Sequence, residues 1–186
     1  MYSRNGNPNQ HWLEEKVAAF HNADDAIVLT SGVAALHALF WTLLKTGDRV
    51  VYPKVSYMAV YRLFHELFNR KFGVDTVMVD MTDLEEVRKA ITPGTRLVHI
   101  ETPDNPTNGV SDIEAIAKIA HENGAVTFPL RMQKINASAL AIAEWLENRE
   151  NVTFVSYPGL ESNKGHALAV RQMRNGFGGV ISLAKL

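Results

Sequence analysis

The sequence contains no cysteine, and this absence excludes several classes of chemistry. Without a thiol there is no disulfide scaffold, no thiol nucleophile and no thiolate-bound metal, and the composition is compatible with a cytosolic protein. No apolar run approaches the ~18 residues that a membrane-spanning helix needs. The polar first residues also lack the apolar core of a signal peptide. We therefore expect a cytoplasmic protein that has no membrane as a partner.

An excess of one charge is also missing. The chain has 19 basic and 20 acidic side chains, a formal net charge of -1 and no basic block. Nothing in this balance favours nucleic acid as a partner. Of the 186 residues, 46% are hydrophobic and 21% are charged, which is the composition of an ordinary globular protein.

The seven histidines show no metal-binding spacing. The sequence has no His-Glu-x-x-His pattern, which would place two imidazoles on one face of a helix. We interpret His65, His99 and His121 as scattered surface or strand-end residues. No metal site is predicted.

What the sequence does contain is a strand-to-helix junction around Ser31. Residues 26–29 form a short apolar run typical of a buried strand, and apolar residues at helical spacing follow Gly32. A helix that begins here aims unpaired backbone N–H groups and its positive dipole end at one position, which favours an anion such as phosphate. Ser31 can add a hydroxyl donor, and Gly32 permits close approach of the backbone. Many such junctions are only tight turns, so the junction alone leaves both interpretations open.

Short apolar strands alternate with helices as far as Phe128. This alternation predicts an α/β fold with a doubly wound, mostly parallel sheet. Ligands of such sheets bind at the carboxyl ends of the strands, where Ser31, Tyr57 and residues 101–105 are expected to lie. The predicted strands are 26–29, 49–52, 76–79, 97–100 and 125–128, and the predicted helices are 12–20, the segment after Gly32, 56–69, 83–91 and 112–120.

The pattern changes after Phe128. A long amphipathic helix is predicted over 130–146, followed by a strand at 152–157, a helix at 166–173 and a last strand at 180–183. These elements read as the start of an α+β subdomain. We therefore predict a first domain over 1–128 and a second over 129–186.

Separate segments of the chain carry a family resemblance. They are Tyr2-Ser3-Arg4-Asn5-Gly6-Asn7-Pro8, Thr30-Ser31-Gly32-Val33-Ala34-Ala35 and Glu101-Thr102-Pro103-Asp104-Asn105-Pro106, supported by Tyr157-Pro158-Gly159-Leu160 and Gly176-Phe177-Gly178-Gly179. In this order they resemble the Cys/Met-metabolism pyridoxal-phosphate enzymes: cystathionine synthases and lyases, methionine gamma-lyase and homoserine-ester sulfhydrylases. The resemblance implies an incomplete fold type I pyridoxal-phosphate transferase, acting on sulfur amino acids as a homo-oligomer.

The resemblance also implies roles for single residues. Main-chain amides would hold the cofactor phosphate, an aromatic ring would stack on the pyridine near the substrate, an amide would reach the ring hydroxyl, and the first residues would reach the phosphate in a neighbouring subunit. The main-chain amides are those of Ser31, Gly32 and Val33, and the stacking ring is that of Tyr57. The amide is that of Asn105, and the first residues are Tyr2 and Arg4. On local sequence alone, Tyr57 reads equally as a surface aromatic, Asn105-Pro106 as a turn and Arg4 as a solvated charge.

The family pattern breaks after Phe128. Family members continue into an aspartate that pairs with the pyridine nitrogen and a lysine that binds the cofactor covalently. Here Phe128 runs directly into Pro129-Leu130-Arg131-Met132, which resembles a segment far downstream of that lysine. Lys134 is the lysine nearest the junction, but it has no matching context. Two interpretations compete: an internally deleted, catalytically impaired carbon–sulfur lyase or gamma-replacement enzyme, and a non-catalytic protein that associates with full-length homologues.

Overall fold

A computed structural model describes residues 6–21, 23–130, 136–173, 176–177 and 181–185. The chain divides into a unit of residues 1–42 and a unit of residues 43–186. The predicted domain boundary after residue 128 is a separate matter and stays a prediction.

The first unit contains helix α1, Pro8–His21, and nearly all of helix α2, Gly32–Leu43. Both helices were predicted, and α1 is longer than expected. The strand predicted over 26–29 is wrong: these residues are not in a sheet, and Ile27 is 78% exposed. The backbone of Val28 is bound by α1 instead, because its N–H donates to Glu14 Oε1 at 2.9 Å and its carbonyl accepts from Gln10 Nε2 at 3.2 Å. An apolar run becomes a strand only where a neighbouring strand offers it a ladder.

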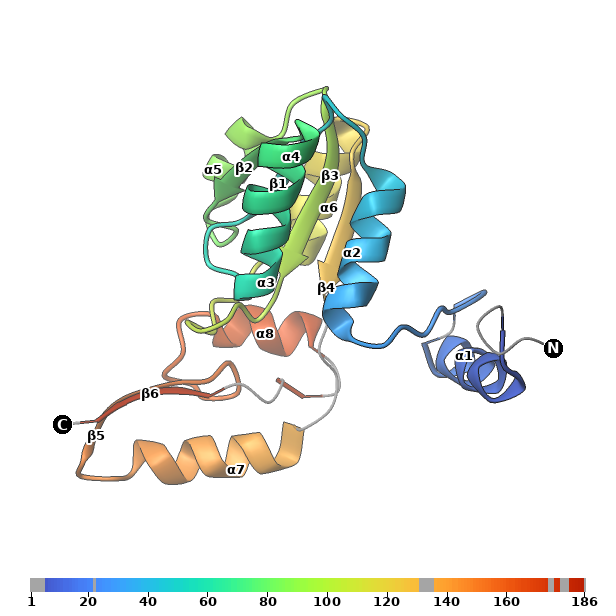
Figure 1. Cartoon of the computed structure of the whole chain (residues 1–186). Coiled ribbons are helices and arrows are strands. Elements are labelled where there is room, and N and C mark those ends of the chain that lie inside the picture. Colours follow the sequence, from blue (N-terminus) through green and yellow to red (C-terminus); the bar gives the residue numbers. More distant parts are fainter. Residues whose placement is uncertain (1–5, 22, 131–135, 174–175, 178–180, 186) are drawn as a thin grey trace. The chain divides into compact units, whose positions relative to one another are not determined.

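The second unit contains a four-stranded parallel sheet in the order β2-β1-β3-β4 (Figure 1). This sheet confirms the predicted α/β class, with one strand fewer than the sequence suggested. Its strands are β1 Arg49–Pro53, β2 Asp75–Val79, β3 Thr95–Glu101 and β4 Val126–Leu130. Its crossover helices are the consecutive segments α3 Met58–Tyr61, η2 Arg62–Asn69 (a π-helix) and α4 Arg70–Phe72, then α5 Leu84–Ala90 and α6 Ile113–Glu122.

Local signals fix several helix ends as predicted. Asp83 accepts from the backbone N–H groups of Glu85 and Glu86 and caps α5. Asp112 accepts from Ala115 N at 3.0 Å and caps α6. Past the end of α6, Gly124 has a φ of 73°, a left-handed conformation that glycine adopts without strain. Each such cap contributes about 1 kcal/mol, so these boundaries follow from the sequence itself.

The central strands of this sheet, β1 and β3, are buried on both faces, as strands of parallel sheets commonly are. On one face a core cluster packs α5 and α6 against the strands and includes Val51, Val98 and Ile116, which are all fully buried. On the other face Phe64 of η2 packs against Tyr52 and His99, with ring centroids 4.8 and 5.9 Å away. The strands are thereby fixed, and with them the loops that leave their carboxyl ends.

The rest of the second unit contains helix α7, Asn136–Glu147, and an antiparallel pair of strands, β5 Val152–Ser156 and β6 Ser182–Lys185. Helix α8, His166–Gln172, lies between these strands in the sequence. The helix predicted over 130–146 is partly wrong. Leu130 belongs to β4, where it pairs with Glu101 of β3, and α7 begins at Asn136. The last strand begins two residues later than predicted, and Val180 lies outside the described residues.

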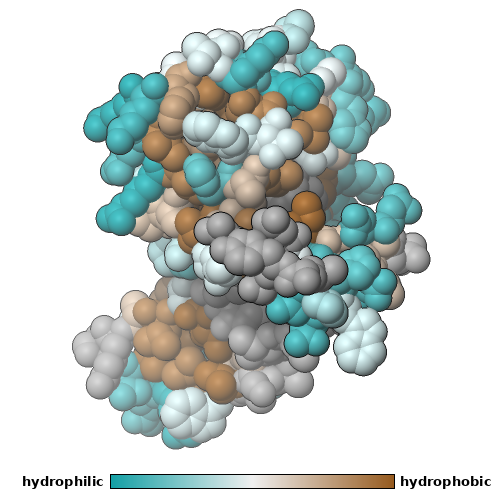
Figure 2. All heavy atoms as spheres, turned by 45° about the vertical axis from the view of Figure 1, so that its right-hand side comes forward, coloured by the Kyte–Doolittle hydropathy of each residue, from teal (hydrophilic) through white to brown (hydrophobic). Residues whose placement is uncertain are grey.

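Large apolar side chains also reach the surface, and Figure 2 shows hydrophobic patches on the face it draws. In the second unit Phe154 is 57% exposed, Trp145 55% and Val126, on β4, 40%. None of the helices in the described part of the chain is long and apolar enough to cross a bilayer.

Candidate functional site

The start of α2 has the geometry of an anion site. Ser31 caps the helix: its Oγ accepts from Ala34 N at 3.1 Å, and its carbonyl accepts from Ala35 N at 3.0 Å. The Ser31 hydroxyl hydrogen stays available for an outside acceptor, because the cap uses only an oxygen lone pair. The N–H groups of Gly32 and Val33 lie in the first turn of this 12-residue helix, where no carbonyl of the helix itself can reach them. The dipole of the helix adds to their attraction for an anion.

Gly32 leaves open space at this point. A Cβ added there would meet no heavy atom within 4 Å, and the backbone of Gly32 is not in the left-handed region. Glycine is therefore not required here by backbone strain or by packing within the described residues. The space outside the helix start is what a phosphate group would need.

Tyr57 and Asn105 are held by one buried carboxylate. Glu101, the last residue of β3, is only 6% exposed. Its Oε2 accepts from Tyr57 N at 2.8 Å, and the carboxylate also accepts from the backbone N–H of Asn105. Burial raises the pKa of Glu101 above its ordinary value, although these two hydrogen bonds act in the opposite direction. Glu101 therefore joins the loop after β1 to the loop after β3.

The side chain of Tyr57 is available to a ligand. Tyr57 is 45% exposed. The backbone carbonyl of Tyr57 accepts from Val60 N at 2.8 Å at the start of α3. An aromatic ring at this point can stack on a flat ligand. Asn105 is exposed as well, in the loop that follows Glu101.

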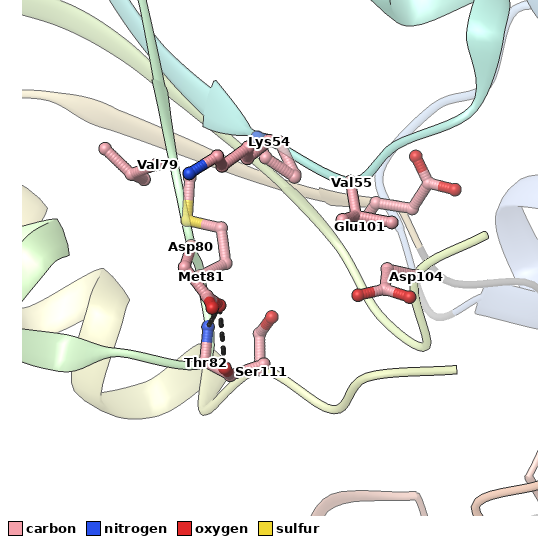
Figure 3. Close-up of a pocket in the computed structure, with 10 residues that line it drawn as sticks. Lys54, Val55, Val79, Asp80, Met81, Thr82, Glu101, Asp104 and Ser111 are labelled. Atoms are coloured by element: carbon pink, nitrogen blue, oxygen red, sulfur yellow. Dashed lines mark hydrogen bonds between the residues drawn. The ribbon is translucent and has the colours of Figure 1, made fainter. Parts of the chain in front are cut away.

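A small pocket of about 40 Å³ lies beside Glu101, between the loops that follow β1, β2 and β3 (Figure 3). Lys54, Asp80 and Asp104 contribute charged groups to its wall. Asp80 accepts from Thr82 N at 2.9 Å and from Thr82 Oγ1 at 2.7 Å. Asp104 accepts from Gly109 N at 3.0 Å, and burial raises its pKa. This volume has room for a few water molecules and is too small for a cofactor.

The structure brings together only some of the residues predicted for the site. Tyr57 and Asn105 meet through Glu101 within the second unit. Ser31, Gly32 and Val33 belong to the first unit. Tyr2 and Arg4 lie outside the described residues, so their roles stay predictions. The described part of the chain contains no group of three or more side chains that could hold a metal ion.

The interpretation of His99 as a surface or strand-end residue is wrong. It lies within β3, and its side chain is fully buried. Burial lowers the pKa of His99 from 6.5 to about 4, because the charged imidazolium is poorly solvated there. Burial likewise raises the pKa of Tyr52, on the same face of the sheet, to about 12.

Comparison with known proteins now gives the class of the chain. The family described as Cys/Met metabolism PLP-dependent enzyme matches residues 1–128 and 123–185. The chain belongs to this family, which confirms the resemblance seen in the motifs. It is a family of enzymes that use pyridoxal phosphate.

Individual relatives agree with this class. The chain is 32% identical to a canavanine gamma-lyase of Pseudomonas canavaninivorans, over 99% of this chain and 66% of the relative. It is 30% identical to an L-methionine gamma-lyase of Fusobacterium nucleatum subsp. nucleatum, over 98% and 66%. The crystal structure of metB from Corynebacterium glutamicum superposes with a TM-score of 0.89 at 28% identity, covering 99% of this chain and 67% of that one.

The chain spans slightly less than two thirds of the relatives' length and lacks positions inside that span. The alignment to the canavanine gamma-lyase runs over 262 positions, whereas this chain has 186 residues, so at least 76 positions of the relative have no counterpart here. The two family matches meet at residues 123–128, which places the break at β4.

Proposed function

We propose that this chain binds pyridoxal phosphate weakly and without a covalent bond, through part of a family site, and that it is catalytically impaired. The observation that carries the proposal is the two-part family match, which meets at β4 and omits the stretch in between. By resemblance, that stretch carries the aspartate that faces the pyridine nitrogen and the lysine that binds the cofactor covalently.

By resemblance, the residues that remain would bind the phosphate and one face of the ring. The amides of Gly32 and Val33 and the hydroxyl of Ser31 would hold the phosphate, since the space outside Gly32 is open. Tyr57 would stack on the ring, and Asn105 would donate to its hydroxyl group. Tyr2 and Arg4 would complete the phosphate site of a second copy, in agreement with the homo-oligomer that we predict.

When bound, the cofactor supplies an electron-withdrawing ring for bond cleavage next to an amino group. The chain's own residues would bind and orient the cofactor. By resemblance, the group that would move a proton at the reacting carbon is the missing lysine. The ancestral reaction would be carbon–sulfur cleavage or gamma-replacement on a sulfur amino acid or a homoserine ester. We propose that this reaction is lost or strongly reduced here.

Titration by calorimetry tests the binding site. Wild type should bind pyridoxal phosphate with a Kd between about 1 µM and 1 mM, a free energy of roughly 4 to 8 kcal/mol. In Gly32→Val the new side chain would occupy the open space at the helix start, and the affinity should fall at least about tenfold, equivalent to about 1.4 kcal/mol.

The matched control is Gly94→Val. An added Cβ at Gly94 also meets nothing within 4 Å, and Gly94 lies in the turn before β3. This variant should bind like wild type, and so should Lys134→Ala. Equal binding by wild type and Gly32→Val would contradict the phosphate site. A covalent adduct that disappears in Lys134→Ala would restore a catalytic interpretation.

The alternative function is non-catalytic association with full-length homologues. It is favoured by β4, which pairs only with β3 among the described strands and therefore leaves one edge of the sheet open. Mixing the chain with a full-length relative should then give a stable mixed oligomer in size-exclusion chromatography with light scattering. The chain alone should self-associate at micromolar concentration. A monodisperse monomer that stays separate from the relative would rule out this alternative.

A further inference from the structure

The loop that carries Asn105 is closed by the carboxylate of Asp104 and by backbone hydrogen bonds. We call residues 102–111, between β3 and α6, the Asn105 loop. Asp104 Oδ1 accepts from Gly109 N at 3.0 Å and from the hydroxyl of Thr107. The backbone closes the same turn, because Asp104 N donates to Gly109 O at 3.0 Å and Asn108 N donates to Asp104 O at 3.1 Å. The loop therefore has a defined shape of its own.

Asn108 ties this loop to a distant part of the chain. Its backbone has a φ of 57°, a left-handed conformation that asparagine tolerates better than most residues, and its side chain is only 1% exposed. Nδ2 of Asn108 donates to Ser156 O at 2.7 Å and to Ser182 Oγ at 3.2 Å. Both acceptors belong to the β5–β6 pair, 48 and 74 residues further along the sequence.

The serines of the β5–β6 pair bind the loop in return. Ser156 Oγ donates to Thr107 O at 2.9 Å and accepts from Asn163 Nδ2 at 3.1 Å. The Ser182 hydroxyl donates to Pro106 O. Residues 106, 107 and 108, directly after Asn105, are thus each hydrogen-bonded to β5 or β6. Ser156 is 7% exposed, so its contacts lie in a site where water competes little.

We propose that the β5–β6 pair fixes the Asn105 loop, and that Asn108 and Ser156 are positioning residues for Asn105. The inference rests on the proposed function in assigning a cofactor contact to Asn105. An exposed side chain on a loop contributes more to binding when its backbone is ordered beforehand, because less conformational entropy is then lost. Glu101 orders the loop at its first residues, and the β5–β6 pair orders the residues after Asn105. The strands β5 and β6, which follow the break at β4, thereby position Asn105, which precedes the break.

Hydrogen exchange tests the hold on the loop without any ligand. In Asn108→Gly the left-handed backbone is retained, but the amide that binds Ser156 and Ser182 is lost. The N–H groups of Asp104 and Gly109 should exchange at least about tenfold faster, with the other described elements unchanged. Ser156→Ala should act in the same direction.

The matched control is Asn69→Ala. Asn69 Nδ2 donates to Val74 O at 2.9 Å, a bond of the same kind between a side chain and the backbone, but far from the loop in sequence. Its loss should leave exchange at Asp104 and Gly109 as in wild type. Unchanged exchange in Asn108→Gly, or equal acceleration in Asn69→Ala, would overturn the inference.

A comparison of two ligands separates positioning from general destabilisation. In Asn108→Gly the affinity for pyridoxal phosphate should fall about tenfold, while the affinity for inorganic phosphate, which would use only the start of α2, should not change. Equal weakening of both ligands would overturn the positioning role. A wild-type chain that binds inorganic phosphate but gains nothing from the pyridine ring would overturn the contact assigned to Asn105. Hydrogen exchange would still decide whether the β5–β6 pair holds the loop.

Discussion

Lowering the pH from 6.5 to about 4 should remove roughly 3 kcal/mol of the stability that the wild-type protein owes to His99. The pKa of His99 falls from 6.5 to about 4 on burial within β3. The unfolded chain therefore binds a proton in this pH range that the folded chain does not, and the free energy of unfolding must fall as the pH falls. A pKa difference of about 2.5 units corresponds to roughly 3 kcal/mol, at about 1.4 kcal/mol per unit.

Urea unfolding followed by circular dichroism between pH 4 and pH 7 measures this effect. His99→Leu places an apolar side chain of similar size against Phe64, and this side chain has no site for a proton. The difference in unfolding free energy between wild type and His99→Leu should therefore shift by roughly 3 kcal/mol across the range, in favour of the variant at low pH. The contributions of Glu101 and Asp104, whose pKa values are raised, cancel in this difference. His121→Leu, at an exposed position in the last turn of α6, is the matched control and should show no such shift. A pH-independent difference for His99→Leu would contradict the prediction.

Elements with a local signal could be predicted from the sequence. Asp83 and Asp112 mark helix starts because their side chains cap backbone N–H groups two or three residues away. Gly124 marks a helix end because its φ of 73° suits glycine. The parallel class followed from the alternation of strands and helices. All of these depend on residues that are close together in the chain.

Features that depend on distant partners could not be predicted. The run at 26–29 has the composition of a strand, but the backbone of Val28 is bound by Glu14 and Gln10 of α1. The sequence predicts that Glu101 lies at a strand end near the site, but not that its carboxylate binds the backbone of Tyr57, which lies 44 residues away in the sequence. Asn108 precedes Gly109, and an Asn-Gly pair is typical of a turn, so the turn itself has a local signal in the sequence. The contact of Asn108 with Ser156, 48 residues further along the chain, has no such local signal.

Glu101→Ala should destabilise the second unit by about 2 to 4 kcal/mol, because it removes two hydrogen bonds to one buried carboxylate, each contributing about 1.5 to 3 kcal/mol. This range lies below the sum of about 3 to 6 kcal/mol for the two bonds, because removing the carboxylate also relieves the cost of its burial, and because water can bind the freed N–H groups of the exposed residues Tyr57 and Asn105. Loss of the acceptor would release the loop after β1 and the Asn105 loop from each other.

Glu101→Gln separates the acceptor from the rest of the side chain. The amide of glutamine fills the same space and offers one acceptor oxygen, but its NH₂ group faces one of the two backbone donors. This variant should therefore lose about half as much stability as Glu101→Ala. Urea unfolding at pH 7 gives the free energies of unfolding. The matched control is Glu122→Ala, which removes an exposed carboxylate in the last turn of α6 and should stay within about 0.5 kcal/mol of wild type.

Because both proposed ring contacts depend on Glu101, pyridoxal phosphate should also bind more weakly to Glu101→Ala, whereas inorganic phosphate should bind as to wild type. If Glu101→Ala were as stable as wild type and bound pyridoxal phosphate equally well, the carboxylate would not be what holds Tyr57 and Asn105 in place.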